Sequence, residues 1–277
     1  MRRAVRSSLR RDRKGDIATS LDAGEIRPKR EPWWAILGIF IAGFAALCLL
    51  MASPMLIRSF LYQPFNAPSG SMMPTILVGD YFFVSKYPYG YSRFTWPLSW
   101  PTGLPPSARI FGATPARGDV VAFVLPKDNA TVYIKRVVGL PGDRVQMKGG
   151  VLYINDAAVP RERLEDLIGT EACGGGANVH VKRWRETLPD GASYETLDCV
   201  DNGFLDNTSV HVVQEGKLYL IGDNRDNSTD SRVLNVIGDV PIENVIGRAA
   251  MIYFSLAAGG KNQSGGFRFG RIGTVIR

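Results

Sequence analysis

The sequence predicts a mainly β protein that follows a single membrane-spanning helix. Three observations support this prediction. Residues 33–57 form an apolar run of 25 residues without a charge. The rest of the chain contains short runs rich in β-branched and aromatic residues, each bounded by Gly, Pro, Asn or Asp. The 30 Gly and 17 Pro residues favour a loop-rich β fold over a helix bundle.

The apolar run from Trp33 to Ile57 is long enough to cross a bilayer. At about 1.5 Å per residue, a helix of this length spans roughly 37 Å, and the hydrocarbon core is about 30 Å thick. Two tryptophans begin the run and Arg58 follows it. A cleavable signal peptide is the alternative, but its apolar region is usually only about 7–15 residues long. We therefore predict an uncleaved anchor.

Residues 1–32 are strongly basic. They hold ten Lys or Arg and five Asp or Glu, and so carry most of the net charge of +7. By the positive-inside rule, a basic segment before a membrane helix is a cytoplasmic tail. Nucleic-acid binding is the other interpretation, but the rest of the sequence has no clustered basic face. We expect a cytoplasmic tail (1–32), an anchor (33–57) and an exported-side domain (58–277).

Short strands are expected throughout residues 58–277. The clearest runs are 81–85, 119–124, 131–134, 151–154, 218–221 and 250–254. Residues 140–143 read LPGD, which indicates a tight turn between two strands. We expect twisted antiparallel sheets with partial barrel closure. Two insertions, at about 87–115 and 156–216, interrupt the pattern, and the fold is expected to include a β-rich insertion.

The cysteines and histidines indicate no metal site. Cys48 lies in the apolar run, whereas Cys173 and Cys199 lie in the second insertion. An oxidising compartment would permit a bridge between these two, and the sequence leaves open whether their Cα atoms come within reach. His180 and His211 have no C-x-x-C or H-x-x-x-H partner. Neither a metal site nor a serine–histidine triad is therefore expected.

A serine-containing segment follows the anchor. Residues 68–74 read PSGSMMP and precede the first predicted strand. A plain Ser/Gly/Pro linker would explain the serines and the glycine, but not Met-Met-Pro. A serine hydroxyl is a weak nucleophile that needs a neighbouring base. Gly70 would let the backbone approach a substrate closely.

A lysine in an apolar strand is a candidate for that base. Residues 133–143 read YIKRVVGLPGD, and Lys135 is flanked by Ile134 and, two residues on, by Val137. A strand lysine usually points to water. If Lys135 faces the apolar side, desolvation lowers its pKa and leaves a neutral amine near pH 7, as a general base requires.

A third segment is polar throughout. Residues 222–232 read GDNRDNSTDSR between two apolar runs. An EF-hand calcium loop starting at Asp226 would need Gly in its sixth place and Glu in its twelfth, where this chain has Ser231 and Ile237. A calcium loop is therefore rejected. A plain polar loop and a side-chain hydrogen-bond network around a site both remain open.

These three segments, in this order after a membrane anchor, resemble the bacterial type I signal peptidases. That family consists of Ser/Lys endopeptidases with an all-β catalytic core. The resemblance implies that Ser71 is the nucleophile and Lys135 the general base. Lysine, rather than histidine, at this place points to a bacterial enzyme. Ser69 and the backbone N–H of Ser71 would stabilise the developing oxyanion.

The resemblance also implies supporting and substrate-binding residues. Ser228 matches a serine that orients the lysine amine. The polar scaffold behind the lysine is matched by Asp230, Arg232 and Arg136. The substrate groove is matched by Phe65, Pro68, Met72, Ile76, Tyr133 and Ile134. Such an apolar groove accepts small side chains, which implies cleavage after an Ala-x-Ala-like site.

The resemblance implies a function and a location as well. The enzyme would remove N-terminal signal peptides from exported preproteins, as a monomer without cofactor, metal or nucleic acid. It would lie in the bacterial inner membrane, with a cytoplasmic N-terminus and a periplasmic or extracytoplasmic catalytic domain. Phe94, Trp96 and Trp100 are predicted to dip into the membrane interface.

Two alternative functions stay open. One is a specialised conjugation or pilus-maturation peptidase of the same superfamily, which would share the Ser/Lys pair but have few substrates. The other is a catalytically inactive, membrane-tethered β module that only binds exported proteins.

Overall fold

The computed structural model describes most of the chain beyond the basic tail. The described residues are 32–96, 101, 103–105, 107–168, 171–173, 179–257 and 265–277. The predicted tail up to residue 31 lies outside them, as does Trp100. The chain divides into two units, Met1–Leu49 and Leu50–Arg277.

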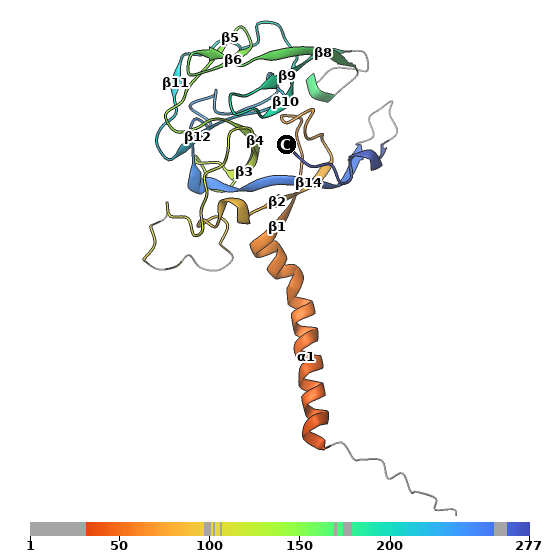
Figure 1. Ribbon diagram of the computed structural model, residues 1–277. Coiled ribbons are helices and arrows are strands. Elements are labelled where there is room, and N and C mark those ends of the chain that lie inside the picture. Colours follow the sequence, from red (N-terminus) through yellow and green to blue (C-terminus); the bar gives the residue numbers. More distant parts are fainter. Residues whose placement is uncertain are drawn as a thin grey trace, which may run out of the picture. The chain divides into compact units, whose positions relative to one another are not determined.

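The first described element is the helix α1, Trp33–Leu56, which a turn of π-helix, Ile57–Leu61, continues (Figure 1). No residue of α1 is buried by the protein, although the helix is apolar on every side. A helix of this kind is stable in lipid rather than in water. Within the described ranges, it is the one helix long and apolar enough to cross a membrane.

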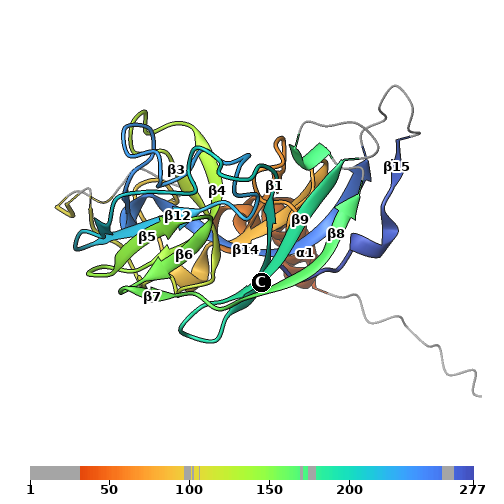
Figure 2. The same ribbon diagram turned by 90° about the horizontal axis from the view of Figure 1, so that it is seen from above.

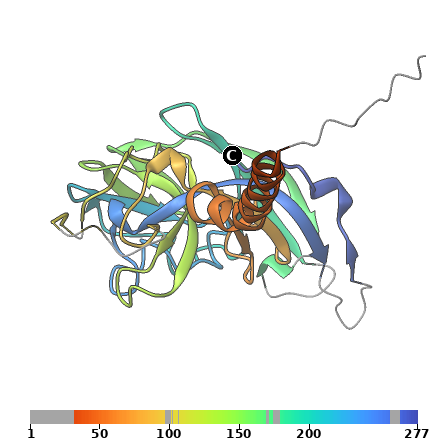
Figure 3. The ribbon, with the colours of Figure 1, turned by 90° about the horizontal axis from the view of Figure 1, so that it is seen from below.

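The largest sheet is antiparallel and contains eight strands. Along the sheet lie β1 (Tyr62–Asn66), β2 (Asp80–Ser85), β14 (Val245–Ala257), β3 (Val120–Val124), β4 (Val132–Gly139), β12 (Lys217–Ile221) and β13 (Val240–Pro241), and β15 (Gly266–Phe267) pairs with β14. β14 shifts register at three places along its pairs with β2 and β3. Such irregularities bend and twist a strand, and the long curve of β14 can be followed in Figure 3.

Two smaller sheets complete the β structure that follows α1. One contains β5 (Arg144–Lys148), β6 (Val151–Ile154), β7 (Ala157–Ala158) and β11 (His211–Val212). The other contains β8 (Arg161–Ile168), β9 (His180–Thr187) and β10 (Ser193–Asp198), and Figure 2 shows the two groups apart from each other. The prediction of a mainly β fold of twisted antiparallel sheets, with partial closure and a β-rich insertion, is confirmed.

The edge strand β1 is the longest strand of the main sheet that the sequence patterns did not predict; the two-residue strands β13 and β15 are the others. β1 contains Pro64, which cannot donate a hydrogen bond to a neighbouring strand. Among the described strands β1 pairs only with β2. The edge position therefore tolerates the proline.

β4 changes character along its length. Its first three residues are exposed or half-buried, whereas every residue from Lys135 to Gly139 is buried. Since side chains of a strand alternate between its two faces, this second half of β4 is covered on both. Along the chain, Lys135 is therefore the first residue of β4 that is fully buried.

Two of the aromatic residues predicted to dip into the membrane interface pack against the protein itself. Phe94 is half-buried against a core cluster. Trp96 packs edge-on against Phe60 and Tyr91, with ring centroids 6.4 and 5.9 Å away. Membrane contact by these side chains remains a prediction.

Candidate active site

Ser71 and Lys135 lie in direct contact, although they are 64 residues apart in the chain. Ser71 belongs to the loop between β1 and β2, and Lys135 belongs to β4. Lys135 Nζ donates to Ser71 Oγ at 2.7 Å and to the carbonyl oxygen of Ile134 at 3.0 Å. The contact joins a hydroxyl and an amine in the geometry that proton transfer between them requires.

The surroundings of Lys135 favour its neutral form. The residue is only 3% exposed. Burial lowers the pKa of the amine to about 8, against the opposing attraction of Asp230 and Asp223. A substantial share of the amine is then neutral at mildly alkaline pH, whereas an exposed lysine is almost fully charged there.

The loop that carries Ser71 is anchored by its apolar residues. Met72, Met73 and Ile76 are all buried. The backbone closes tight turns here, because Met73 N–H donates to Gly70 O at 3.1 Å and Ile76 N–H to Met72 O at 2.9 Å. The methionines therefore hold the serine in place, which a flexible linker would not do.

Ser69 lies beside Ser71 on the same loop. Its Oγ is 3.5 Å from Ser71 Oγ, and the side chain is exposed to solvent. The two hydroxyls are therefore neighbours at the edge of one loop.

Arg136 fixes the opposite face of β4. Its buried guanidinium donates to both carboxylate oxygens of Asp223, each at 2.7 Å, and to Gly118 O at 2.7 Å. Asp223 also accepts a hydrogen bond from Thr75 Oγ1 at 2.5 Å. One buried ion pair therefore connects β4, the polar segment 222–232 and the loop that carries Ser71.

Asp230 and Arg232 form a second buried pair. Arg232 Nε and Nη2 donate to the Asp230 carboxylate at 2.9 and 2.8 Å, and Gly222 N–H donates to it at 3.1 Å. Burial alone would raise the pKa of Asp230, but Arg232 and these hydrogen bonds hold it below its usual value. The carboxylate stays charged and helps to balance the Lys135 amine.

Ser228 lies close to this centre, but among the described residues no hydrogen bond joins its hydroxyl to the Lys135 amine, so its orienting role stays a prediction. The hydrogen bonds of Lys135 to described residues go to Ser71 and Ile134. Ser228 Oγ makes no hydrogen bond of normal geometry with a described residue, although it is near enough to Asp230 to favour its charged form.

A groove of about 570 Å³ opens above the pair. It is lined by all six predicted substrate-binding residues, Phe65, Pro68, Met72, Ile76, Tyr133 and Ile134, together with Ser69, Ser71 and Lys135. Its other lining residues, which sequence reasoning did not identify, are Asn66, Ala67, Thr131, Val132, Asn227 and Thr229. One wall follows β1 and the loop after it, and the other follows the first half of β4.

A buried cluster from the second insertion was also missed. Arg225, in the polar segment 222–232, forms an ion pair with Glu186, and its Nη2 donates to Tyr194 Oη at 3.3 Å. The guanidinium of Arg136 lies over the Tyr194 ring, 4.1 Å from its centroid. Arg225 could have been predicted, because it belongs to the polar segment. Glu186 and Tyr194 lie in no motif that the sequence analysis recognised.

The fold and this site, a serine hydroxyl in contact with a buried lysine in an apolar groove, are those of a serine protease. Comparison with known proteins gives the family. Residues 37–254 match the family described as signal peptidase, peptidase S26. Signal peptidase I of Rickettsia typhi is 40% identical over 219 residues, which cover 76% of this chain and 79% of that protein.

A second curated relative is similar over most of the chain. Signal peptidase I of Rickettsia akari is 40% identical over 233 residues, which cover 82% of this chain and 80% of that protein. The crystal structure of a signal peptidase I from Enterococcus faecalis matches with 26% identity and a TM-score of 0.28, covering 49% of this chain and 97% of that one. The chain belongs to the S26 family of signal peptidases, serine proteases that remove signal peptides.

Proposed function

We propose that this enzyme removes N-terminal signal peptides from exported preproteins by acyl transfer, with Ser71 as the nucleophile and Lys135 as the general base. The observation that supports this most strongly is the 2.7 Å contact between Lys135 Nζ and Ser71 Oγ. The lowered pKa of the buried lysine supports it further. The intact pair also argues against an inactive binding module.

The cycle begins when neutral Lys135 takes the proton of Ser71. Ser71 Oγ attacks the carbonyl carbon of the last residue of the signal peptide, and the oxyanion is stabilised by the Ser69 hydroxyl and the Ser71 N–H. Lys135 then gives the proton to the amine of the departing mature protein. A water activated by Lys135 hydrolyses the ester and frees the signal peptide.

The walls of the groove suit an extended peptide. β1 pairs only with β2 among the described strands, and β12 joins β4 only from Arg136 onward. Backbone groups of β1 and of residues 132–135 are therefore available on the sides that face the groove, and an extended substrate can pair with them as an added strand. The apolar lining favours small residues at alternate positions, as in Ala-x-Ala.

The location follows from α1 and the tail. We place α1 in the inner membrane and residues 1–32 in the cytoplasm, because the positive charge precedes the helix. The catalytic unit, residues 58–277, then lies on the periplasmic or extracytoplasmic side. Preproteins emerge from the membrane on that side.

Cleavage of purified preproteins tests this function. The full chain in detergent is incubated with several preproteins whose signals end in Ala-x-Ala, and the new N-terminus is identified by mass spectrometry. We expect one cut after the final alanine, and no cut with Ser71→Ala. Cutting of only one preprotein among many would favour the specialised peptidase, and no cutting at all would contradict the proposal.

A further inference from the structure

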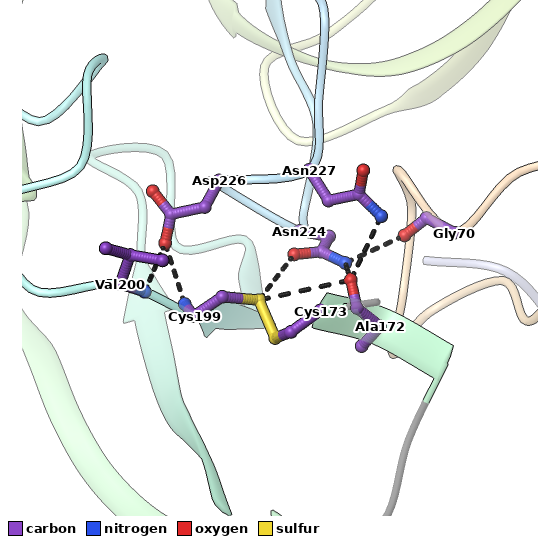
Figure 4. The surroundings of a disulfide bond; sticks show 8 residues. All are labelled: Gly70, Ala172, Cys173, Cys199, Val200, Asn224, Asp226 and Asn227. Atoms are coloured by element: carbon purple, nitrogen blue, oxygen red, sulfur yellow. Dashed lines mark hydrogen bonds between the residues drawn. A yellow bond between two sulfur atoms is a disulfide. The ribbon is translucent and has the colours of Figure 1, made fainter. Parts of the chain in front are cut away.

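A disulfide lies beside the loop that carries the nucleophile. Cys173 ends a short 3₁₀ turn, Glu171–Cys173, and Cys199 follows β10; their Cα atoms are 5.7 Å apart. Cys199 is held further, because its N–H donates to Asp226 Oδ2 at 2.7 Å. The bridge therefore ties the turn containing Ala172 to the polar segment 222–232 (Figure 4).

The carbonyl of Ala172 accepts hydrogen bonds from two asparagines of that segment. Asn224 Nδ2 donates to it at 2.7 Å, and Asn227 Nδ2 at 3.0 Å (Figure 4). Ala172 and Asn224 are both fully buried. The disulfide thus holds one carbonyl oxygen where it orients two side-chain amides.

Asn224 in turn holds the backbone on both sides of Ser71. Its Nδ2 donates to Gly70 O at 3.1 Å, and its backbone N–H donates to Ser71 O at 3.1 Å. The two protons of the side-chain amide are used by Gly70 and Ala172, so the amide has one favourable orientation. Because a peptide unit is planar, fixing Gly70 O also fixes the direction of the Ser71 N–H.

Apolar packing joins the same parts. Met73, from the loop that carries the nucleophile, shares a buried cluster with Ala172, Val181 and Leu197, and both bridged cysteines pack against it. Backbone bonds add to this, since Leu197 N–H donates to Asp223 O at 2.9 Å. The second insertion is therefore a support of the active site and not a separate module.

We infer that Asn224 is a positioning residue for Ser71, and that the Cys173–Cys199 disulfide sets its orientation through the Ala172 carbonyl. The inference rests on the proposed function, because it assigns to the bridged turn the task of aiming the Ser71 N–H and hydroxyl. Loss of the bridge frees the Ala172 carbonyl to move, and the Asn224 amide loses the partner that aims it at Gly70. The nucleophile then spends less time in the reactive geometry.

A double-mutant cycle on the full chain in detergent tests this inference. Its members are Asn224→Ala, the paired variant Cys173→Ala/Cys199→Ala, and their combination. All carry Cys48→Ser, which removes the free cysteine, so that the Cys173–Cys199 bridge is the one target of a reductant. We expect each change to lower kcat about tenfold with KM altered less than about twofold, because neither Asn224 nor the cysteines line the groove. The combination should be no slower than the slower single member, since both changes break one connection.

Reduction of the unaltered bridge is a second arm that changes no residue of the site. Dithiothreitol should lower kcat of Cys48→Ser about tenfold and leave the paired cysteine variant unchanged. The pH dependence of kcat should keep its midpoint in every member, because Lys135 makes no hydrogen bond to the bridged turn.

The outcomes separate this inference from the proposed function. If the Cys48→Ser enzyme cleaves preproteins and neither reduction nor cysteine replacement changes kcat, the inference is overturned while the function stands. Losses that multiply to about a hundredfold in the combination would also overturn it, because Asn224 would then act independently of the bridge. If the Cys48→Ser and wild-type enzymes cleave nothing, both fail together.

Discussion

At the scale of single residues, the chemistry depends on how far Lys135 is removed from water. The residue is 3% exposed, and burial lowers the pKa of its amine to about 8. In the proposed mechanism the neutral amine is the reactive form, so activity should rise as pH rises through this pKa. We therefore predict that kcat/KM increases about tenfold per pH unit below pH 7 and levels off above about pH 8. A profile that is flat from pH 6 to 9 would contradict this assignment.

Gly222 is a second residue with a sharp requirement. A Cβ at this position would lie 2.2 Å from Ser228 Oγ and 2.6 Å from the Ser71 backbone oxygen. Gly222→Ala should therefore push the nucleophile out of place and lower kcat more than about tenfold. Gly270→Ala is the matched control, because a Cβ there meets nothing within 4 Å. Equal activity of the two variants would show that Ser71 tolerates the displacement.

At the scale of elements, the Arg136–Asp223 pair holds β4 against the polar segment. Both side chains are 1% exposed. Asp223→Asn should destabilise the fold by about 3–5 kcal/mol, because it leaves a buried guanidinium without its counter-charge. Urea unfolding would measure this loss.

The control for this prediction is a pair of the same type on the surface. Arg144 and Asp156 are 49% and 64% exposed, so Asp156→Asn should cost little or nothing. If the two asparagine variants unfold at the same urea concentration, the buried pair is not the connection described here.

The elements also show what the sequence could and could not predict. β2, β3, β4, β6, β12 and β14 contain the runs of β-branched and aromatic residues that predicted them. β8 and β9 are rich in charged side chains, so they carry no such signal. Ser71 and Lys135 were recognised from local motifs. Asn224 lies in a motif too, but its role depends on Ala172, 52 residues away, in a segment without a motif.

At the scale of the whole molecule, α1 and the basic tail are expected to decide where the enzyme works. In spheroplasts, trypsin added outside should digest the catalytic unit and spare an epitope placed before residue 10. This result follows if the positive charge of residues 1–32 keeps the N-terminus in the cytoplasm. Loss of the epitope while the catalytic unit survives would reverse the proposed topology.

The proposed function of the enzyme depends on one lysine acting as the base. The most direct measurement compares preprotein cleavage by wild type, Lys135→Ala and Lys86→Ala at pH 8. Lys86 is the matched control, because burial lowers its pKa too, yet it donates to Ser59 O and lies outside the groove. We predict that Lys135→Ala loses at least about a hundredfold in rate while Lys86→Ala stays close to wild type. Retained cleavage by Lys135→Ala would contradict the central claim.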